Sequence, residues 1–290
     1  MTKNIFSPIR SIIKDAKKGR MFILVDSKNR ENEGDLVIPG SKCNSKTINF
    51  MAKHGRGLIC LALSKKQTDK LKIPLMSQIN KSRMQTAFTV SIEARKGIST
   101  GISAFDRAKT IKVAINPKST KKDIVSPGHV FPLVARNGGV LERAGHTEAS
   151  IDISKMSNLN PSSVICEVMN EDGRMARLDD LIRFSKKHKI KIASIADIIA
   201  YRFKNEKLVY KAQSKNHVYK NFNNTQVSIF KNKINNNESI VLSRGKFKKN
   251  KSIPVRVISK KINQKKLLQN KEIKKNIKIL SKYKNFLLVI

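Results

Sequence analysis

The sequence predicts an α+β protein in which helices flank a β-sheet, with a small basic appendage at the C-terminal end. Up to about residue 205, apolar runs of strand length alternate with segments of helical period. The composition then changes, because residues 206–290 hold 22 lysines and arginines against 3 acidic residues, whereas residues 1–205 hold 38 against 18. We therefore expect two domains, 1–205 and 206–290.

The elements expected in the first domain follow from the spacing of apolar residues. A capped, amphipathic first helix is indicated by an apolar face made of Ile9, Ile12, Ile13 and Ala16. Two more helices are expected at residues 178–189 and 194–204, the second with Ser194 as its N-cap. The expected strands are 21–26, 57–63, 88–94, 162–169 and 190–194.

The second domain holds strand-like pieces at 226–230, 239–245 and 253–259, which favour a small β-rich unit. A partly ordered segment is the alternative, because a high net charge opposes compaction.

No stretch of the chain approaches the roughly 18 to 20 apolar residues of a membrane-spanning helix. The first 20 residues also lack the apolar core of a secretory signal, so we expect a cytoplasmic protein without a membrane partner. The three cysteines, Cys43, Cys60 and Cys166, share no C-x-x-C spacing. We interpret them as small buried apolar residues, not as a zinc or redox pair.

The formal charge of +39 raises the hypothesis of a nucleic-acid partner, because lysine and arginine bind phosphates. However, 45 lysines stand against 15 arginines, aromatic residues make up 6% and tryptophan is absent. This bias is typical of drift toward AT-rich codons, and a dedicated nucleic-acid surface would interleave aromatics with arginine. We expect no nucleic-acid binding beyond non-specific attraction, but the positive field favours anionic substrates.

The densest group of acidic residues follows the first expected strand. Glu31, Glu33 and Asp35 lie within five positions, beside Arg30. Closely spaced carboxylates repel one another, so a cation stabilises such a loop, and oxygen ligands suit Mg²⁺ or Mn²⁺. A solvated charged loop is the alternative.

A second group combines anion-binding and metal-binding residue types within six positions. Arg143 offers a planar fork of donors for phosphate, Gly145 lets backbone amides approach an anion, and Thr147 adds a hydroxyl. His146 is a candidate ligand for the same metal, which Glu148 would orient as a hydrogen-bonding partner. A simple turn with a structural histidine is the alternative.

Two single residues are candidates for acid–base work. His129 lies between Pro127 and Pro132, which restrict the path of the chain around it. Glu167 sits in an apolar strand, where burial would raise its pKa toward the range useful for proton transfer. A hydrogen-bonded structural histidine and an edge-strand glutamate are the alternatives. No glycine-rich nucleotide-binding loop is present.

Taken in chain order, the motifs resemble one family. They are RENEGD (30–35), KHGRGLICLAL (53–63), TAFTVSIEA (86–94), STGISAFDRAKTI (99–111), PGHVFPL (127–133), RAGHTEA (143–149) and VICEVMNEDGRMAR (164–177). Over about residues 5–205 the chain resembles 3,4-dihydroxy-2-butanone 4-phosphate synthase of riboflavin biosynthesis. The resemblance implies a mixed β-sheet flanked by helices in three layers, and a homodimer with its sites at the subunit interface.

The resemblance also implies an activity. The family's magnesium-dependent lyase reaction converts D-ribulose 5-phosphate to 3,4-dihydroxy-2-butanone 4-phosphate and formate, through a metal-stabilised enediol and a skeletal rearrangement. It implies Glu31 and His146 as metal ligands, and His129 and Glu167 as catalytic residues. The implied substrate-binding residues are Arg30, Glu31, Asp35, Arg143, Ala144, Gly145, His146, Thr147 and Glu167.

Three positions carry less definite expectations. Glu33 and Cys60 match positions near the family's site, without a firm role. Gln85 departs from the family, whose members often carry a small residue or glycine just before the following threonine.

The segment after residue 205 faintly resembles the opening of a GTP cyclohydrolase II domain, to which this synthase is fused in many bacteria. That domain needs a cysteine cluster for zinc, and no cysteine follows Cys166. We therefore expect a truncated remnant that is inactive as a cyclohydrolase. Two competing hypotheses are a basic nucleic-acid-binding protein with a vestigial site, and a still-bifunctional enzyme.

Overall fold

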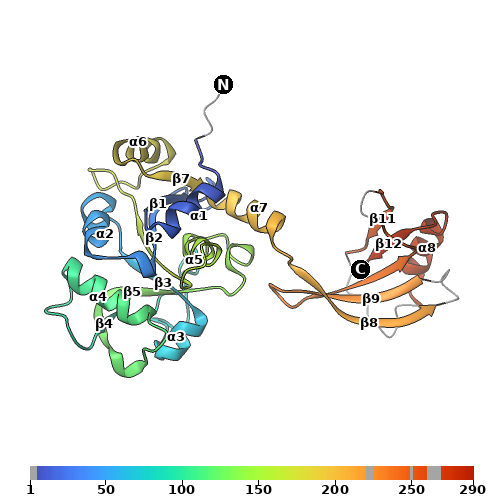
Figure 1. Ribbon diagram of the computed structural model, residues 1–290, viewed down its shortest axis with the longest axis horizontal. Coiled ribbons are helices and arrows are strands. Elements are labelled where there is room, and N and C mark those ends of the chain that lie inside the picture. Colours follow the sequence, from blue (N-terminus) through green and yellow to red (C-terminus); the bar gives the residue numbers. More distant parts are fainter. Residues whose placement is uncertain (1–4, 220–224, 249–250, 260–268) are drawn as a thin grey trace. The chain divides into compact units, whose positions relative to one another are not determined.

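The computed structural model describes residues 5–219, 225–248, 251–259 and 269–290. The chain divides into two compact units, Met1–Asn205 and Glu206–Ile290, which Figure 1 shows in blue to yellow and in orange to red, respectively. Within the described ranges, no helix combines the length and apolar character that crossing a bilayer requires.

The first unit is built on a seven-stranded mixed sheet with the strand order β4-β5-β3-β6-β2-β1-β7. Two neighbouring pairs are parallel, β3 with β5 and β1 with β7, and the other neighbours are antiparallel. The strands are β1 Phe22–Val25, β2 Gly34–Pro39, β3 Cys60–Ser64, β4 Ile92–Ala94, β5 Ile124–Ala135, β6 Ser162–Glu167 and β7 Lys191–Ser194.

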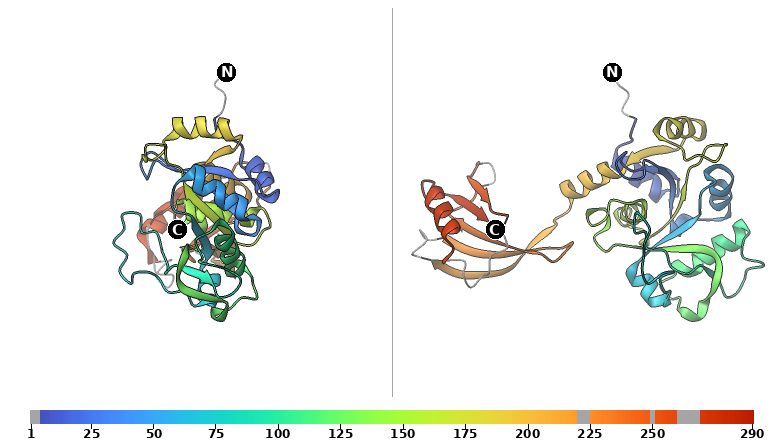
Figure 2. Two further views of the ribbon diagram at one scale, coloured as in Figure 1. Left: turned by 90° about the vertical axis from the view of Figure 1, so that its left-hand side faces the viewer. Right: turned by 180° about the vertical axis from the view of Figure 1, so that it is seen from behind.

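Helices cover both faces of this sheet and complete three layers (Figures 1 and 2). One core cluster joins the sheet to α2 Ser45–Phe50, α3 Lys65–Leu71, α4 Ala104–Ile115 and α6 Leu178–His188. The other joins it to α1 Ile9–Lys17, α5 His146–Met156 and α7 Ile195–Asn205. Alternate residues of β2 point to opposite faces of the sheet. Leu36 and Ile38 belong to the first cluster, and Val37 belongs to the second. Asp35 therefore shares the face of Val37 and faces the α5 layer.

The second unit is a five-stranded sheet with the order β11-β12-β10-β9-β8. Its core includes Ile273, Ile277 and Leu280 of the helix α8, packed against the strands. The elements are β8 Val209–Tyr219, β9 Thr225–Asn232, β10 Glu238–Arg244, β11 Val255–Val257, α8 Lys271–Leu280 and β12 Phe286–Val289.

The sequence predicted the α+β class, the three layers and most strands of the first unit correctly, but it did not predict β2, β5 or the helices α2 to α5. Two of its finer predictions are corrected. Only Ile92–Ala94 of the expected strand 88–94 is a continuous strand, although Phe88 and Thr89 form isolated bridges. The first helix has no side-chain cap, because Pro8 precedes it. Ser194 does cap α7, accepting a hydrogen bond from the backbone N–H of Asp197 at 3.0 Å.

Several of the candidate site residues lie on regular elements. His129 is part of the long strand β5, and Asp35 is part of β2. His146 and Thr147 form the first turn of α5.

The three cysteines are free thiols. Cys60 and Cys166 are buried, as predicted, and burial raises the pKa of each thiol, whereas Cys43 is only partly buried.

Candidate functional site

The acidic loop between β1 and β2 is shaped by the buried side chain of Asp26. Its Oδ2 accepts hydrogen bonds from the backbone N–H of Glu31 at 3.0 Å and from the Arg30 guanidinium at 2.9 Å. Its Oδ1 accepts from the backbone N–H of Glu33 at 2.9 Å. The loop turns through Asn32, whose φ of 56° lies in the left-handed region. Asp26 thus fixes the position from which Glu31 extends.

A second clamp holds the same loop from outside. Arg177, at the start of α6, donates hydrogen bonds to the carbonyl oxygens of Glu31 at 2.9 Å and of Asn32 at 2.5 Å. The Arg177 guanidinium also lies 3.8 Å from the carboxylate of Glu33.

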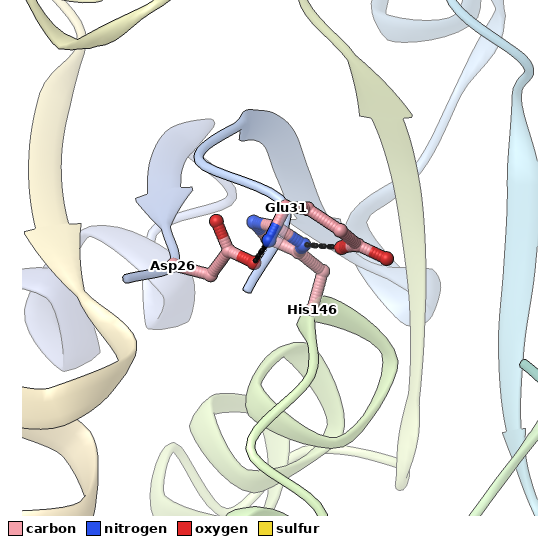
Figure 3. A group of neighbouring side chains, drawn as sticks. All are labelled: Asp26, Glu31 and His146. Carbon is pink, nitrogen blue, oxygen red and sulfur yellow. Dashed lines mark hydrogen bonds and ion pairs between the residues drawn. The ribbon is translucent and has the colours of Figure 1, made fainter. Parts of the chain in front are cut away.

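The first turn of α5 brings His146 to this loop, although the two segments are far apart in sequence. The Nδ1 atom of His146 lies 3.5 Å from Oε2 of Glu31 (Figure 3). The same Nδ1 lies 3.9 Å from Oδ1 of Asp35. The side chains of His146 and Asp35 are nearly inaccessible, whereas that of Glu31 is 25% exposed. Arg30 pairs with both Asp26 and Glu31. An imidazole and two carboxylates therefore converge beside an arginine.

The electrostatics of this cluster are strongly perturbed. Burial raises the pKa of Asp35 to about 7, although the neighbouring His146 opposes the shift. Burial alone would lower the pKa of His146, but the Asp35 and Glu31 carboxylates outweigh it and raise that pKa to about 9. The bond to His146, followed by the Arg30 charge, holds the pKa of Glu31 below its usual value despite burial. Proton and cation binding are thus closely linked here.

The cluster fits a divalent cation. Two ligands of one ion with bonds of about 2.1 Å are separated by roughly 3 Å when adjacent and about 4 Å when opposite. The 3.5 Å between Glu31 and His146 falls within that range. The other ring nitrogen of His146, Nε2, is buried without a hydrogen-bond partner among the described residues, as expected where a ligand or substrate binds.

Asp26 also lies within reach of the same point, since ligand atoms of Asp26, Glu31 and His146 are all within 4.8 Å of one another. Both of its oxygens, however, already accept hydrogen bonds from the loop. We therefore treat Asp26 as the organiser of the loop and Glu31 and His146 as the ligand pair.

Glu167 adds a second carboxyl group with a raised pKa. It ends β6 directly opposite Asp35 of β2, so both side chains lie on the α5 face of the sheet. Its Oε2 accepts a hydrogen bond from the backbone N–H of Leu58 at 2.8 Å, and burial raises its pKa. Gly57 makes this approach possible, because a Cβ there would lie 2.6 Å from both the carbonyl oxygen and Oε2 of Glu167.

The N-terminus of α5 is the candidate anion site. Gly145 precedes the helix, and a Cβ on it would lie 2.3 Å from the Arg143 guanidinium and 3.0 Å from that of Arg30. Two arginines thus approach a helix start whose backbone N–H groups favour an anion. Thr147 is buried in the same turn. Ala144 is exposed and borders, with Arg30, a cavity of about 470 Å³.

The contacts of Arg143 correct the expected role of Glu148 and bear on the segment around Gln85. Glu148 does not orient His146; it pairs with Arg143 at 2.6 Å and accepts from the backbone N–H of Arg136 at 3.1 Å. Arg143 also donates to Thr86 Oγ1 and to the carbonyl oxygen of Met84, both at 2.9 Å.

Between Met84 and Thr86 lies Gln85, whose φ of 53° is left-handed. A residue other than glycine costs about 1 kcal/mol or more there, which explains why glycine suits that position.

His129 lies in a different cluster. Its Nδ1 bonds Glu93 of β4, and a Cβ on Gly101 would lie 2.8 Å from the ring. The loop holding Gly101 is fastened by Asp106, which accepts from Ser99 Oγ at 2.7 Å and from the backbone N–H of Gly101 at 3.1 Å. The structure therefore brings together Glu31, Asp35, His146 and Glu167, but it does not place His129 among them.

Four residues that position the side chains of these clusters were not predicted from the sequence: Asp26, Arg177, Gly57 and Glu93. Asp26 had a detectable signal, because an aspartate at a strand end often accepts from backbone N–H groups of the turn that follows. Arg177, Gly57 and Glu93 act across strands and helices, and local spacing carries no signal for such contacts.

The chain is similar to known proteins over most of its length. Residues 10–201 match the family model described as 3,4-dihydroxy-2-butanone 4-phosphate synthase. The chain is 47% identical over 256 residues to the riboflavin biosynthesis protein RibBA of Aquifex aeolicus (strain VF5). The matched region covers 88% of this chain and 63% of that protein. It is 52% identical over 203 residues to the 3,4-dihydroxy-2-butanone 4-phosphate synthase of Neisseria meningitidis serogroup B (strain ATCC BAA-335 / MC58), covering 70% of this chain and 56% of that protein. The chain thus spans less than two thirds of the length of either relative.

Solved structures show the same likeness. RibBX, a two-domain 3,4-dihydroxy-2-butanone 4-phosphate synthase from A. baumannii, matches with a TM-score of 0.79 and 36% identity, over 97% of this chain and 81% of that one. A 3,4-dihydroxy-2-butanone 4-phosphate synthase in complex with two magnesium ions matches with a TM-score of 0.66 and 35% identity, over 69% of this chain and 98% of that one. Since the family model spans well over half of the chain, the chain belongs to the 3,4-dihydroxy-2-butanone 4-phosphate synthase family.

Proposed function

We propose that this protein converts D-ribulose 5-phosphate to 3,4-dihydroxy-2-butanone 4-phosphate and formate in riboflavin biosynthesis, as a magnesium-dependent lyase. The observation that carries the proposal is the meeting of Glu31 and His146 at 3.5 Å beside Asp35. Family membership supports the substrate, and the magnesium bound to a similar structure supports the cation. Purified protein incubated with ribulose 5-phosphate and Mg²⁺ should release formate, and EDTA should stop it. Absence of formate under these conditions contradicts the proposal.

Each residue has a task that its surroundings favour. Glu31 and His146 would hold Mg²⁺ or Mn²⁺, which supplies stabilisation of negative charge on neighbouring substrate oxygens. Glu167, whose burial raises its pKa, is suited to accept and return a proton. Asp35 and Arg30 would hold the sugar hydroxyls. The segment 143–147 at the start of α5 would bind the phosphate. Arg143 would give up its hydrogen bond to the carbonyl oxygen of Met84 and donate to the phosphate instead.

The metal-free protein is expected to lose stability as pH rises. Asp35 has a folded pKa of about 7 against an ordinary 3.8, so its destabilising effect grows from about pH 4 to pH 7. His146 has a folded pKa of about 9 against 6.5, so its stabilising charge is lost as pH rises through 9. A bound cation takes the place of these protons. The rise in melting temperature on adding Mg²⁺ should therefore be larger at pH 8 than at pH 6.

The control for this measurement is Glu31→Gln, in which added Mg²⁺ should raise the melting temperature at neither pH. An equal rise at both pH values in the unaltered protein would contradict the linkage between proton and cation.

Gly57→Ala is expected to lower the rate of formate release about 100-fold, with little change in KM. The added Cβ meets the backbone of Glu167 as well as its carboxylate, so rotation of the side chain cannot relieve the clash. A displacement of about 1 Å in a catalytic group is enough for such a loss.

Gly173→Ala is the matched control for Gly57→Ala. Apart from its chain neighbours, none of the described residues has an atom within 4 Å of the Cβ added at Gly173, although its φ of +85° makes alanine strained. It should therefore lower the melting temperature and leave turnover largely intact. Wild-type turnover in Gly57→Ala would contradict the positioning of Glu167 by Gly57.

We infer a homodimer in which His129 serves the partner's site. The His129 side chain is 44% exposed, and two nearby apolar residues of the segment 99–106 are conspicuously exposed, Ile102 at 54% and Phe105 at 76%. These features support an interface at that surface.

Subunit mixing tests this arrangement. Glu31→Gln and His129→Ala proteins are each expected to be nearly inactive, but each mixed dimer would contain one complete site. A statistical mixture should regain about a quarter of wild-type activity. No regain after exchange of subunits would show that His129 does not act across the interface.

We propose that residues 206–290 are a cyclohydrolase-like unit that by itself turns over no GTP. The similarity to RibBA runs over 256 residues and so extends beyond the first unit, while residues 206–290 contain no cysteine to hold zinc. GTP turnover by the purified chain would contradict this.

A further inference from the structure

Two Lys–aromatic–Lys triplets lie next to each other in the second unit. Lys246–Lys248, with Phe247 at its centre, follows β10. Lys282–Lys284, with Tyr283 at its centre, lies between α8 and β12. Since β10 and β12 are antiparallel neighbours, with Arg244 opposite Phe286, the end of one strand adjoins the start of the other. We call the two triplets together the lysine–aromatic patch.

Arg244 and Asn285 hold the patch together. Arg244 donates to the carbonyl oxygen of Tyr283 at 2.7 Å and to that of Ser281 at 3.2 Å, and its guanidinium lies 5.3 Å from the ring centre of Phe286. Asn285 donates from its side chain to the carbonyl oxygen of Lys246 at 3.0 Å. Hydrogen bonds from side chains to backbone carbonyl oxygens thus fix the two triplets relative to each other.

The aromatic rings of the patch are on the surface. Phe247 is 47% exposed and Tyr283 is 49% exposed, and neither belongs to the apolar core of the unit. The four flanking lysines are also exposed, as is Lys278 in the last turn of α8. In the described part of the chain, none of these five lysines pairs with a carboxylate. A helix end alone accounts for Lys278, because cations are favourable there, but it does not account for two exposed aromatic rings.

We propose that the lysine–aromatic patch binds single-stranded nucleic acid without sequence preference. Ammonium groups attract the phosphates, and Phe247 and Tyr283 offer flat faces on which unpaired bases stack. The scarcity of aromatics in the whole chain argues against a nucleic-acid surface, but the fold gathers two of them among lysines that pair with no carboxylate in the described ranges. The second unit would thereby hold the enzyme on RNA or single-stranded DNA.

The test uses the full-length protein and a fluorescent 20-nucleotide oligouridylate, with binding followed by anisotropy. Binding at low salt is expected, with the logarithm of affinity falling linearly with the logarithm of salt concentration. Phe247→Leu and Tyr283→Leu should each weaken binding roughly tenfold, because leucine keeps the apolar surface but cannot stack with a base.

Tyr210→Leu is the matched control. Tyr210 is 42% exposed on β8 of the same unit, outside the patch, and its replacement should leave affinity unchanged. Lys282→Gln and Lys284→Gln should each reduce the salt slope by about 0.7. Thermal unfolding of each variant confirms that the unit remains folded.

Three results would overturn the proposal. The leucine variants could bind oligouridylate as tightly as wild type, which would leave only non-specific charge attraction. A duplex of equal length could bind as tightly as the single strand and be equally sensitive to these substitutions, although its bases are already stacked. Finally, the substitutions could weaken binding to vesicles of anionic phospholipid and spare the oligonucleotide, which would assign the patch to a membrane surface.

Discussion

Glu31→Gln is expected to lower formate release by roughly 10³-fold. The substitution keeps the shape of the side chain but removes the anionic ligand that lies 3.5 Å from His146. Metal stabilisation of developing charge is worth several kcal/mol, and each 1.36 kcal/mol corresponds to a factor of ten in rate. Because His146 also loses a carboxylate that raises its pKa, the protonation of the remaining ligand changes as well.

The measurement is the initial rate of formate release over a range of Mg²⁺ concentrations, together with Mg²⁺ affinity from calorimetry. Glu33→Gln is the matched control. Glu33 is two positions away in the same loop, and its carboxylate lies 3.8 Å from the Arg177 guanidinium. The Glu33→Gln variant should retain measurable Mg²⁺ binding. If Glu31→Gln bound Mg²⁺ as tightly as wild type, Glu31 would not be a ligand.

Glu167→Gln should reduce the turnover number by about 10² to 10⁴, the range for loss of a positioned acid–base group. The amide oxygen can still accept the hydrogen bond from Leu58, so the local fold should persist. Since the lost function is proton transfer, KM should change little. The variant should also lose the limb of the pH–rate profile that reports the raised pKa of Glu167.

Exchange of substrate protons in deuterated water, followed by NMR, separates proton transfer from later steps. Glu167→Gln should abolish this exchange. Glu171→Gln, in the same motif, removes a carboxylate that is 84% exposed and should leave exchange and turnover unchanged. Rapid exchange in Glu167→Gln would assign the first proton transfer to another residue.

The elements that the sequence predicted well have one apolar stripe or a short apolar run, such as α6 and β1. Helix α5 was missed because it is buried on nearly every side, from His146 to Ser154, and therefore shows no single apolar face. Strand β2 was missed because its first residues, Gly34 and Asp35, continue a polar acidic motif. In both cases function placed polar residues where the pattern for a buried element would require apolar ones.

The sequence by itself determined the kinds of chemistry available to this protein. Glu31 and Asp35 are held close by the chain, and Arg143, Gly145 and His146 form another local group, so the residue types for cation and anion binding are visible from spacing alone. The family follows from the order of these motifs.

The tertiary structure alone decided which groups meet and how they titrate. Strand pairing sets Glu167 opposite Asp35, and α5 delivers His146 to a loop more than 100 residues earlier in the chain. Packing also separates His129 from that cluster and gathers the two lysine–aromatic triplets. Burial then raises the pKa of Asp35 to about 7, because desolvation and neighbouring charges depend on three-dimensional surroundings that linear spacing does not specify.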